Sequence, residues 1–359
     1  MKLKVGIIII IGCVVYLYGR QPKQIVDDIE MPAVVGYDYV DKDTFKTTFT
    51  IPVYKPDKSV DNRTVSAEGK MSKEAVGKID RKTSRRAVGG KLEVAVYSKR
   101  IAQNGIGGLI DTFHRDPTIS EKLFLTVVDG QAKTLLDKQY SDEDTGVFLS
   151  RLIEHNIEHG LLPTMNLHYF LSAYFSKMRD PFLPLLEKKG NGVNLKGIAL
   201  FKEDRYVKAL PESQLFAFKM LIENMTLGSY KVRLNKDEYV LIQSIHAKHK
   251  YKVHHEKEGP KIDIHLALKG SIREFTGEKL EQKEMTEVEK QMKKQLEKQI
   301  AAMIQSFQKS KIDPIGLGNE VRSRTRNFNR EKWLDQYPNV KVNVKVKVLI
   351  SERGVANGT

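Results

Sequence analysis

Near the C-terminus, apolar and polar residues alternate from Val340 to Val348, and the run closes with Leu349 and Ile350. Successive side chains of a β-strand point to opposite faces. The pattern therefore predicts one strand over residues 339–350, with a buried valine face and a basic face toward solvent. Its lysines would also discourage edge pairing with another chain. A strand with one buried face needs a sheet around it and a second layer packed on that sheet.

A long amphipathic segment upstream can supply that layer. Between about Thr276 and Ser310 apolar residues recur at steps of three and four, and the opposite face consists of Glu, Lys and Gln. This periodicity predicts a helix over residues 276–310. A coiled-coil partner is one alternative, but docking on the neighbouring sheet is favoured. The apolar positions are Met285, Val288, Met292, Leu296, Ile300, Met303, Ile304 and Phe307.

The remaining body mixes short strand and helix patterns. Residues 34–40 and 45–54 are predicted strands joined by the turn-forming Asp41-Lys42-Asp43. Residues 239–245 and 246–255 are predicted as two further strands. We find no internal repeat and no regular strand–helix–strand series in the sequence.

These patterns predict an α+β fold with about three small domains of mostly antiparallel sheets and packed helices, behind an N-terminal membrane anchor. Residues 1–20 would be the anchor. The glycine-containing segment 188–192 suggests a boundary between an N-terminal region, 21–190, and a C-terminal region, 191–359.

The anchor is predicted from the first twenty residues. Lys2 and Lys4 precede an unbroken apolar run from Val5 to Tyr18. The run is shorter than the roughly 20 residues of a spanning helix, so it suits a signal-peptide core or a marginal anchor.

The only cysteine of the chain, Cys13, lies inside this run and follows Gly12. A small residue before a lone cysteine is typical of a bacterial lipoprotein signal. The thiol would take a diacylglyceryl group, and a further acyl chain, such as palmitate, on the freed amine would complete a stable anchor. The segment after Cys13 stays apolar, so an uncleaved signal anchor remains the alternative. With one cysteine, no intramolecular disulfide is available.

The net charge of +15 favours an anionic partner. Binding of nucleic acid would call for interleaved aromatic residues or a recognisable helix motif, and the basic segments show neither. We therefore predict no nucleic-acid partner. A tethered basic body is attracted to an anionic membrane by roughly 1 kcal/mol for each Lys or Arg near the surface.

One segment matches a catalytic motif. His155, Glu158 and His159 fit the H-x-x-E-H pattern of inverted zinc peptidases, in which two imidazoles bind zinc and the carboxylate acts as a base. Catalytic zinc requires a third protein ligand, and the polar face of an amphipathic helix gives the same pattern. The favoured interpretation is that helix face, with a zinc hydrolase as the alternative.

Two other groups of residues were considered as a metal site and as a phosphate-binding segment. His246, His249, His254 and His255 cluster in a basic strand region, where solvated strand positions are favoured over a metal site. The segment Asn104–Gly108 would cradle a phosphate only if it followed a strand and opened a helix, and it lacks a P-loop Lys-Ser/Thr. We therefore predict no catalytic residues, no metal and no cofactor.

Four segments together resemble the Ger(x)C family, the C subunits of spore germinant receptors. They occur in the family's order and span nearly all of residues 25–352. Family members carry Gly-Cys-Trp-Asp directly before the first strand, whereas Cys13 lies further upstream among apolar residues. The segments are Ala33–Asp41, Phe113–Ile119, Leu195–Lys202, and a C-terminal unit of Asp313–Gly318, Trp333 and Tyr337–Val340 with the final strand.

The resemblance implies a non-catalytic lipoprotein or anchored subunit on the outer face of the spore inner membrane. It would be needed for nutrient-triggered germination and would dock on two integral-membrane partners, the A and B subunits. Whether it binds a small-molecule germinant directly is left open. The alternative function is an extracytoplasmic solute-binding lipoprotein, which requires a deep cleft with converging polar groups.

Overall fold

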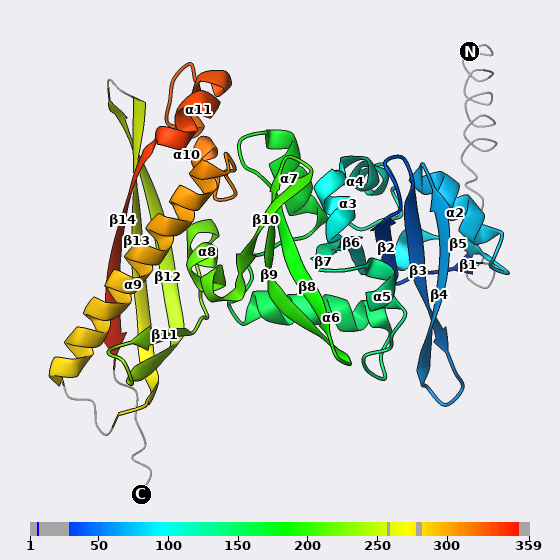
Figure 1. The fold of residues 1–359 in the computed structure, drawn as a ribbon, viewed down its shortest axis with the longest axis horizontal. Coiled ribbons are helices and arrows are strands. Elements are labelled where there is room, and N and C mark those ends of the chain that lie inside the picture. The colour runs from blue at the N-terminus through cyan, green and yellow to red at the C-terminus, as the bar shows by residue number, and fades with distance from the viewer. Residues whose placement is uncertain (1–5, 7–28, 257–258, 278–281, 352–359) are drawn as a thin grey trace, which may run out of the picture.

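The computed structural model describes residue 6 and residues 29–256, 259–277 and 282–351. These residues form an elongated body with a large sheet of eight strands and a smaller sheet of four. Figure 1 shows the smaller sheet at the left, the larger sheet through the centre and right, and the start of the described body at the right-hand end. A short ribbon of β1 (Ile29–Glu30) and β5 (Arg86–Ala87) lies beside that end.

The large sheet has a parallel centre and antiparallel flanks. Strands β2, β6, β7 and β8 pair in parallel, whereas β3–β4 on one side and β9–β10 on the other are antiparallel. In spatial order its strands are β10 (Arg205–Pro211), β9 (Gly192–Lys202), β8 (Phe182–Lys189), β7 (Phe124–Val128), β6 (Val94–Ser98), β2 (Val34–Tyr39), β3 (Phe45–Tyr54) and β4 (Val60–Gly69).

Helices cover both faces of this sheet. Val35 and Tyr37 of β2 face one core and Val34 faces the other, so the strand is apolar on both sides. Parallel strands in the middle of a sheet are typically buried in this way. One core is closed by α2 (Ser72–Asp80), α3 (Lys99–Asn104), α4 (Gly107–His114) and α7 (Leu167–Ser176), and the other by α5 (Ala132–Leu136) and α6 (Thr145–Glu158).

The parallel centre corrects the sequence-based expectation. Mostly antiparallel pairing was predicted, and it holds for the flanks, but the strands between them are linked by helical crossovers. Several short helices in each crossover, rather than one long helix, obscured the strand–helix–strand pattern. The segment 188–192, predicted as a boundary, is the turn of the β8–β9 hairpin, and the chain leaves the large sheet only after β10.

The smaller sheet has the order β11 (Tyr230–Arg233), β12 (Tyr239–Glu256), β13 (Gly259–Phe275) and β14 (Lys341–Ser351). The helix α9 (Gln282–Lys309) crosses one face of it (Figure 1). Helices α8 (Leu215–Ile222) and α10 (Leu317–Ser323) pack near the same layer, and α11 (Arg330–Gln336) follows. Single 3-10 turns occur at Gly89–Lys91, Glu212–Gln214 and Tyr337–Asn339.

Both C-terminal predictions are confirmed in this sheet. The alternation predicted over 339–350 becomes β14, whose lysines are exposed and whose Val346 and Ile350 are buried. All eight apolar positions predicted for the long helix are buried, and α9 contacts β14 and β11 rather than a coiled-coil partner. Residues 278–281 of the predicted helix lie outside the described residues.

One prediction in this sheet is wrong. Residues 239–245 and 246–255 are not two strands but the single strand β12. Ser244 has a φ of 51°, and the pairing with β13 slips between Gln243 and His246. A bulge of this kind shifts the alternation of buried residues without ending the strand.

The two sheets share one core. All residues of α8 from Leu215 to Leu221 are buried. The Phe218 ring lies edge-on to Phe182 of β8, at a centroid distance of 5.1 Å, and to Phe307 of α9, at 6.1 Å. Apolar packing therefore runs without interruption from the large sheet through α8 to the small sheet.

Candidate functional site

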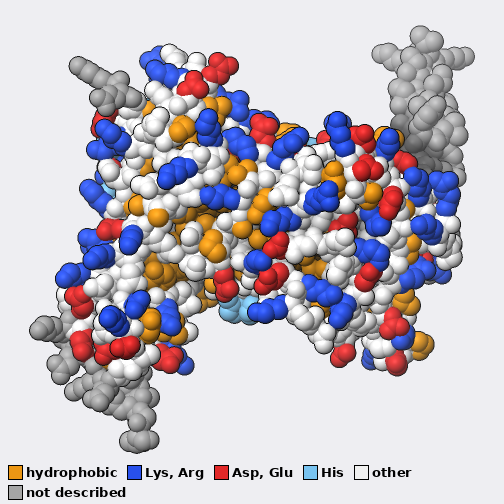
Figure 2. Space-filling model, viewed as in Figure 1, with side chains coloured by type: hydrophobic (Ala, Val, Ile, Leu, Met, Phe, Trp, Pro, Cys, Tyr) orange, Lys and Arg blue, Asp and Glu red, His pale blue; other side chains and the backbone are white. Residues whose placement is uncertain are grey.

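The H-x-x-E-H motif lies at the exposed C-terminal end of α6. The rings of His155 and His159 stack with centroids 3.9 Å apart, and His159 Nδ1 lies 2.9 Å from the His155 carbonyl oxygen. Figure 2 shows histidine side chains on the open surface over this end of α6. Across the described residues, no group of three or more His, Cys, Asp or Glu side chains is arranged to hold a metal ion. The geometry therefore fits the solvated helix face.

The histidines of β12 are dispersed rather than clustered. His246 is exposed, His254 pairs with Asp263 at 3.1 Å, and His255 Nε2 lies 3.0 Å from the Arg324 carbonyl oxygen. His249 packs edge-on to Tyr251. Each ring has its own neighbours, so the four residues do not form a common site.

The N–H groups of the glycine segment bind a carboxylate of this chain, that of Asp204, rather than a phosphate. Asp204, in the β9–β10 turn, accepts the Gly107 N–H at Oδ2 (3.0 Å), and its carbonyl oxygen accepts the Ile106 N–H (3.1 Å). A Cβ added to Gly105 would lie 2.7 Å from the same carboxylate. Segment Asn104–Gly108 therefore fixes the start of α4 to the β9–β10 turn instead of presenting its N–H groups to a phosphate.

The predicted lipid site, Cys13, lies outside the described residues. In the part of the chain that the structure describes, no helix is both long and apolar enough to cross a bilayer.

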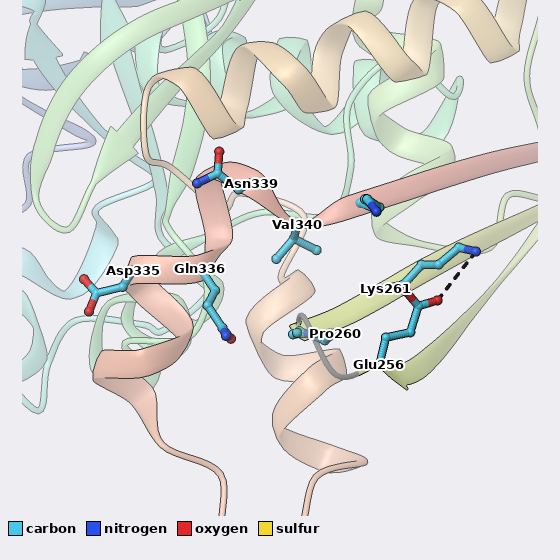
Figure 3. Close-up of a pocket in the computed structure, with 9 residues that line it drawn as sticks. Glu256, Pro260, Lys261, Asp335, Gln336, Asn339 and Val340 are labelled. Atoms are coloured by element: carbon cyan, nitrogen blue, oxygen red, sulfur yellow. Dashed lines mark ion pairs between the residues drawn. The ribbon is translucent and has the colours of Figure 1, made fainter.

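An open pocket of about 260 Å³ lies between the end of the β12–β13 hairpin and α11 (Figure 3). Glu256 and Lys261 form an ion pair of 3.8 Å at its edge. In Figure 3, Gln336 points toward Pro260, whereas Asp335 points away from it. The residues that line the pocket do not place a nucleophile beside a base, so they carry no catalytic constellation.

The largest pocket that we describe is a surface groove of about 750 Å³ beside the turn after β2 and the helices α2, α3 and α4. Ile101 and Leu109 lie buried below it, and Lys42, Asp43 and Lys70 are exposed on its rim. A solute-binding site would require polar groups that converge inside an enclosed space. The charged groups of this groove are on its rim, facing solvent.

The most constrained polar cluster joins the two sheets. Asp180, just before β8, and Asp313, just after α9, bind each other reciprocally: the Asp313 N–H donates to Asp180 Oδ2 at 2.6 Å, and the Asp180 N–H donates to the Asp313 carbonyl oxygen at 3.0 Å. Lys202 of β9 donates to the same Asp180 carboxylate at 3.2 Å. We call this cluster of Asp180, Lys202 and Asp313 the joint.

Asp313 also organises the chain after α9. Its carboxylate accepts the N–H groups of Leu317 (2.9 Å) and Gly318 (2.7 Å), which begin α10. Burial raises the pKa of Asp313 to about 7, although these two backbone donors lower it. Gly316 has a φ of 74°, which favours glycine at this turn.

A buried lysine lies on α8. Lys219 is 5% exposed, donates to the Ile157 carbonyl oxygen at the end of α6 (2.6 Å) and pairs with Glu223 at 3.3 Å. Burial lowers its pKa, and the Glu223 carboxylate opposes that shift. Lys219 therefore links α6, under the large sheet, to α8, which contacts the small one.

The role of the joint was not predicted from the sequence. Segment Asp313–Gly318 indicated only the end of a helix and part of a family resemblance. The N-cap position of α10 is Gly316, so the local sequence gives no capping signal for Asp313, and Asp180 is 133 positions away.

The chain is similar to known spore germination proteins over most of its length. Residues 22–188 match the family model "Spore germination protein N-terminal domain", and residues 196–354 match "Spore germination B3/ GerAC like, C-terminal". The chain is 32% identical to the spore germination protein GerQC of Bacillus cereus, over 95% of this chain and 96% of that protein.

A second relative and a solved structure are also similar to this chain. The chain is 24% identical to the putative spore germination protein YfkR of Bacillus subtilis (strain 168), over 81% of this chain and 78% of that protein. Its fold is similar to the crystal structure of the GerBC protein, with a TM-score of 0.61 at 15% identity, covering 88% of this chain and 96% of that one.

Proposed function

Because the chain belongs to the Ger(x)C family of spore germination proteins, we propose that it acts as a non-catalytic, membrane-tethered C subunit of a germinant receptor in the spore inner membrane. The observation that carries the proposal is the match of residues 22–188 and 196–354 to the two family models of spore germination proteins. The relatives are named as germination proteins and not as enzymes.

In this role the body docks on the extracytoplasmic parts of the integral-membrane A and B subunits and stabilises their ligand-bound state. What supports this is the construction of the body. A continuous core through α8 and the joint between Asp180 and Asp313 connect the two sheets. Closely packed interiors have low compressibility and transmit strain. A contact at one end of the body can therefore displace residues at the other end.

The tether is the N-terminal segment, with Cys13 as the acceptor of a diacylglyceryl group or with the apolar run 5–18 as an uncleaved anchor. Cys13→Ala separates the two. If the lipid is the anchor, the variant is released from the inner-membrane fraction of spores; if the apolar run is the anchor, it stays there. A Gly6→Ala variant is the control, since it leaves the thiol intact.

The test of the function is deletion of the gene. We expect spores to lose germination in response to one class of nutrient while germinating normally by other routes, and re-expression should restore the response. Normal responses to every nutrient tested would overturn the proposal, and so would recovery of the polypeptide free in the soluble spore core.

A further inference from the structure

The smaller sheet leaves one face uncovered, and that face is basic. Helix α9 packs against the face that carries Val346 and Ile350. On the opposite side five exposed lysines project from two strands: Lys248, Lys250 and Lys252 of β12, and Lys345 and Lys347 of β14. We call these five lysines, with the outward residues of β13 between them, the basic face.

The strand register places the charges in rows. Lys250 lies opposite His265 of β13, which lies opposite Lys345 of β14. The next row is Lys248, Ala267 and Lys347. Lysines of one strand are about 7 Å apart along it, and those of β12 and β14 are about 10 Å apart across the sheet. Lys269 of β13 adds an exposed positive charge on the same face, whereas Lys261 is paired with Glu256 (3.8 Å).

The basic face has almost no internal neutralisation. Its one carboxylate, Asp263, is already bonded to Asn343 (2.8 Å) and His254 (3.1 Å). Among the residues that the structure describes, no carboxylate oxygen lies within 4 Å of the ammonium nitrogen of any of the five lysines. Lysines about 7–10 Å apart on one face repel each other, so stability does not explain this arrangement. It fits an anionic partner outside the chain.

The residue types discriminate between anionic partners. Protein interfaces are enriched in aromatic residues, Met and Arg and depleted in Lys. Single-stranded nucleic acid is bound by aromatic stacking and Arg. In these rows of described residues the outward positions hold no Phe, Tyr, Trp, Met or Arg. Lysine is a flexible point charge without a fixed donor geometry, which suits a layer of mobile headgroups.

We infer that the basic face rests on the anionic headgroups of the membrane to which the chain is tethered. The inference builds on the proposed function, which supplies that membrane. Strand β1, where the described body begins, and the smaller sheet lie at opposite ends of the molecule (Figure 1). A tether at one end and a charged contact at the other lay the long axis along the bilayer. The tether also makes the second contact intramolecular, so that a modest affinity is enough.

The test uses the full chain reconstituted on the outer surface of vesicles made of phosphatidylcholine alone or mixed with phosphatidylglycerol. Acetylation rates of individual lysines are measured by mass spectrometry. Each lysine held at an anionic surface corresponds to roughly a fivefold change in equilibrium, so we expect acetylation of the five lysines to slow about fivefold in the anionic vesicles. Lys293 and Lys298, exposed on α9 on the other side of the same sheet, are the internal control.

Salt and substitution sharpen the test. The protection should fade between about 0.1 M and 1 M salt, because the screening length falls from roughly 10 Å to 3 Å. A triple variant Lys248→Gln, Lys250→Gln, Lys345→Gln should remove the protection of Lys252 and Lys347. The matched variant Lys293→Gln, Lys294→Gln, Lys298→Gln removes the same charge from α9 and should retain it.

Equal acetylation in neutral and anionic vesicles would overturn the inference. Protection that appears only when the integral-membrane subunits are added would also overturn it, because the occupant would then be a protein. Either result can coexist with a deletion strain that fails to germinate, so failure of this inference is distinct from failure of the proposed function.

Discussion

At the scale of single residues, the carboxyl group of Asp313 holds the chain between α9 and α10 in place. It accepts the N–H groups of Leu317 and Gly318 in a buried site. An unpaired buried N–H costs about 1–3 kcal/mol, so Asp313→Ala should lower the free energy of unfolding by about 2–4 kcal/mol. Chemical denaturation measures this. Asp142→Ala, at an exposed acid, should stay within about 0.5 kcal/mol; equal effects would contradict the assigned role.

The same residue predicts a pH dependence of stability. Burial raises the pKa of Asp313 from 3.8 to about 7 in the folded protein. Between these values the unfolded chain is ionised and the folded chain stays protonated, so its stabilising contribution is complete below about pH 4 and is lost as pH rises to about 7. Asp180, Arg179 and Lys202 are the charged groups beside it.

Asp313→Asn cannot titrate and is the appropriate comparison. Denaturation midpoints of the wild type should fall between pH 5 and pH 8 by more than those of the variant. A parallel fall in both proteins would assign the pH dependence to other groups.

At the scale of elements, α9 protects the free edge of the smaller sheet. Strand β14 is its outermost strand, and its outward N–H groups at Val346 and Ile350 donate to Glu297 (2.9 Å) and Glu289 (2.8 Å) of α9. Exposed edges of this kind promote association between chains.

Glu297→Ala should therefore open the edge at Val346. We expect concentration-dependent association, measured by light scattering, and a loss of about 0.5–1.5 kcal/mol of stability for the hydrogen bond. Glu297→Gln keeps an acceptor oxygen and should behave like the wild type. Association of both variants to the same extent would mean that charge, not edge protection, is the cause.

The pairing of β9 with β10 requires a glycine at position 197. Gly197 has a φ of 154°, and an added Cβ would lie 2.1 Å from the Leu210 carbonyl oxygen. Gly197→Ala should lose roughly 2–4 kcal/mol through backbone strain and overpacking. Gly77, inside α2, has no atom within 4 Å of an added Cβ, and Gly77→Ala should gain about 0.5–1 kcal/mol. Thermal denaturation of both variants tests whether the first lowers and the second raises the stability.

At the scale of the whole molecule, the shared core predicts cooperative unfolding. Trp333 is the only tryptophan, is buried beside Gly318, and reports on the C-terminal layer. Circular dichroism reports on both sheets. Because the apolar core is continuous through α8, the two signals should change at the same denaturant concentration. An earlier change in Trp333 fluorescence would show that the smaller sheet unfolds independently.

Elements with a local periodic pattern could be predicted from the residues alone. The valine–lysine alternation of 339–350 and the apolar stripe of 276–310 each repeat with the period of one type of structure, so β14 and α9 could be predicted without knowing their neighbours. The predicted strands at 34–40 and 45–54 were found for the same reason. Four segments in the order typical of one family carried the functional hypothesis.

The contacts between those elements could not be predicted in the same way, because they depend on residues far apart in the chain. The parallel centre of the large sheet, the Asp180–Asp313 contact and the Asp204 carboxylate on the Gly107 N–H each join residues far apart in the chain. The rows of the basic face likewise depend on the pairing of β14 with β13, although α9 lies between these two strands in the sequence. Periodicity states which face of an element is apolar, but register and strand order are set by long-range packing, and it is these that bring separate charges together.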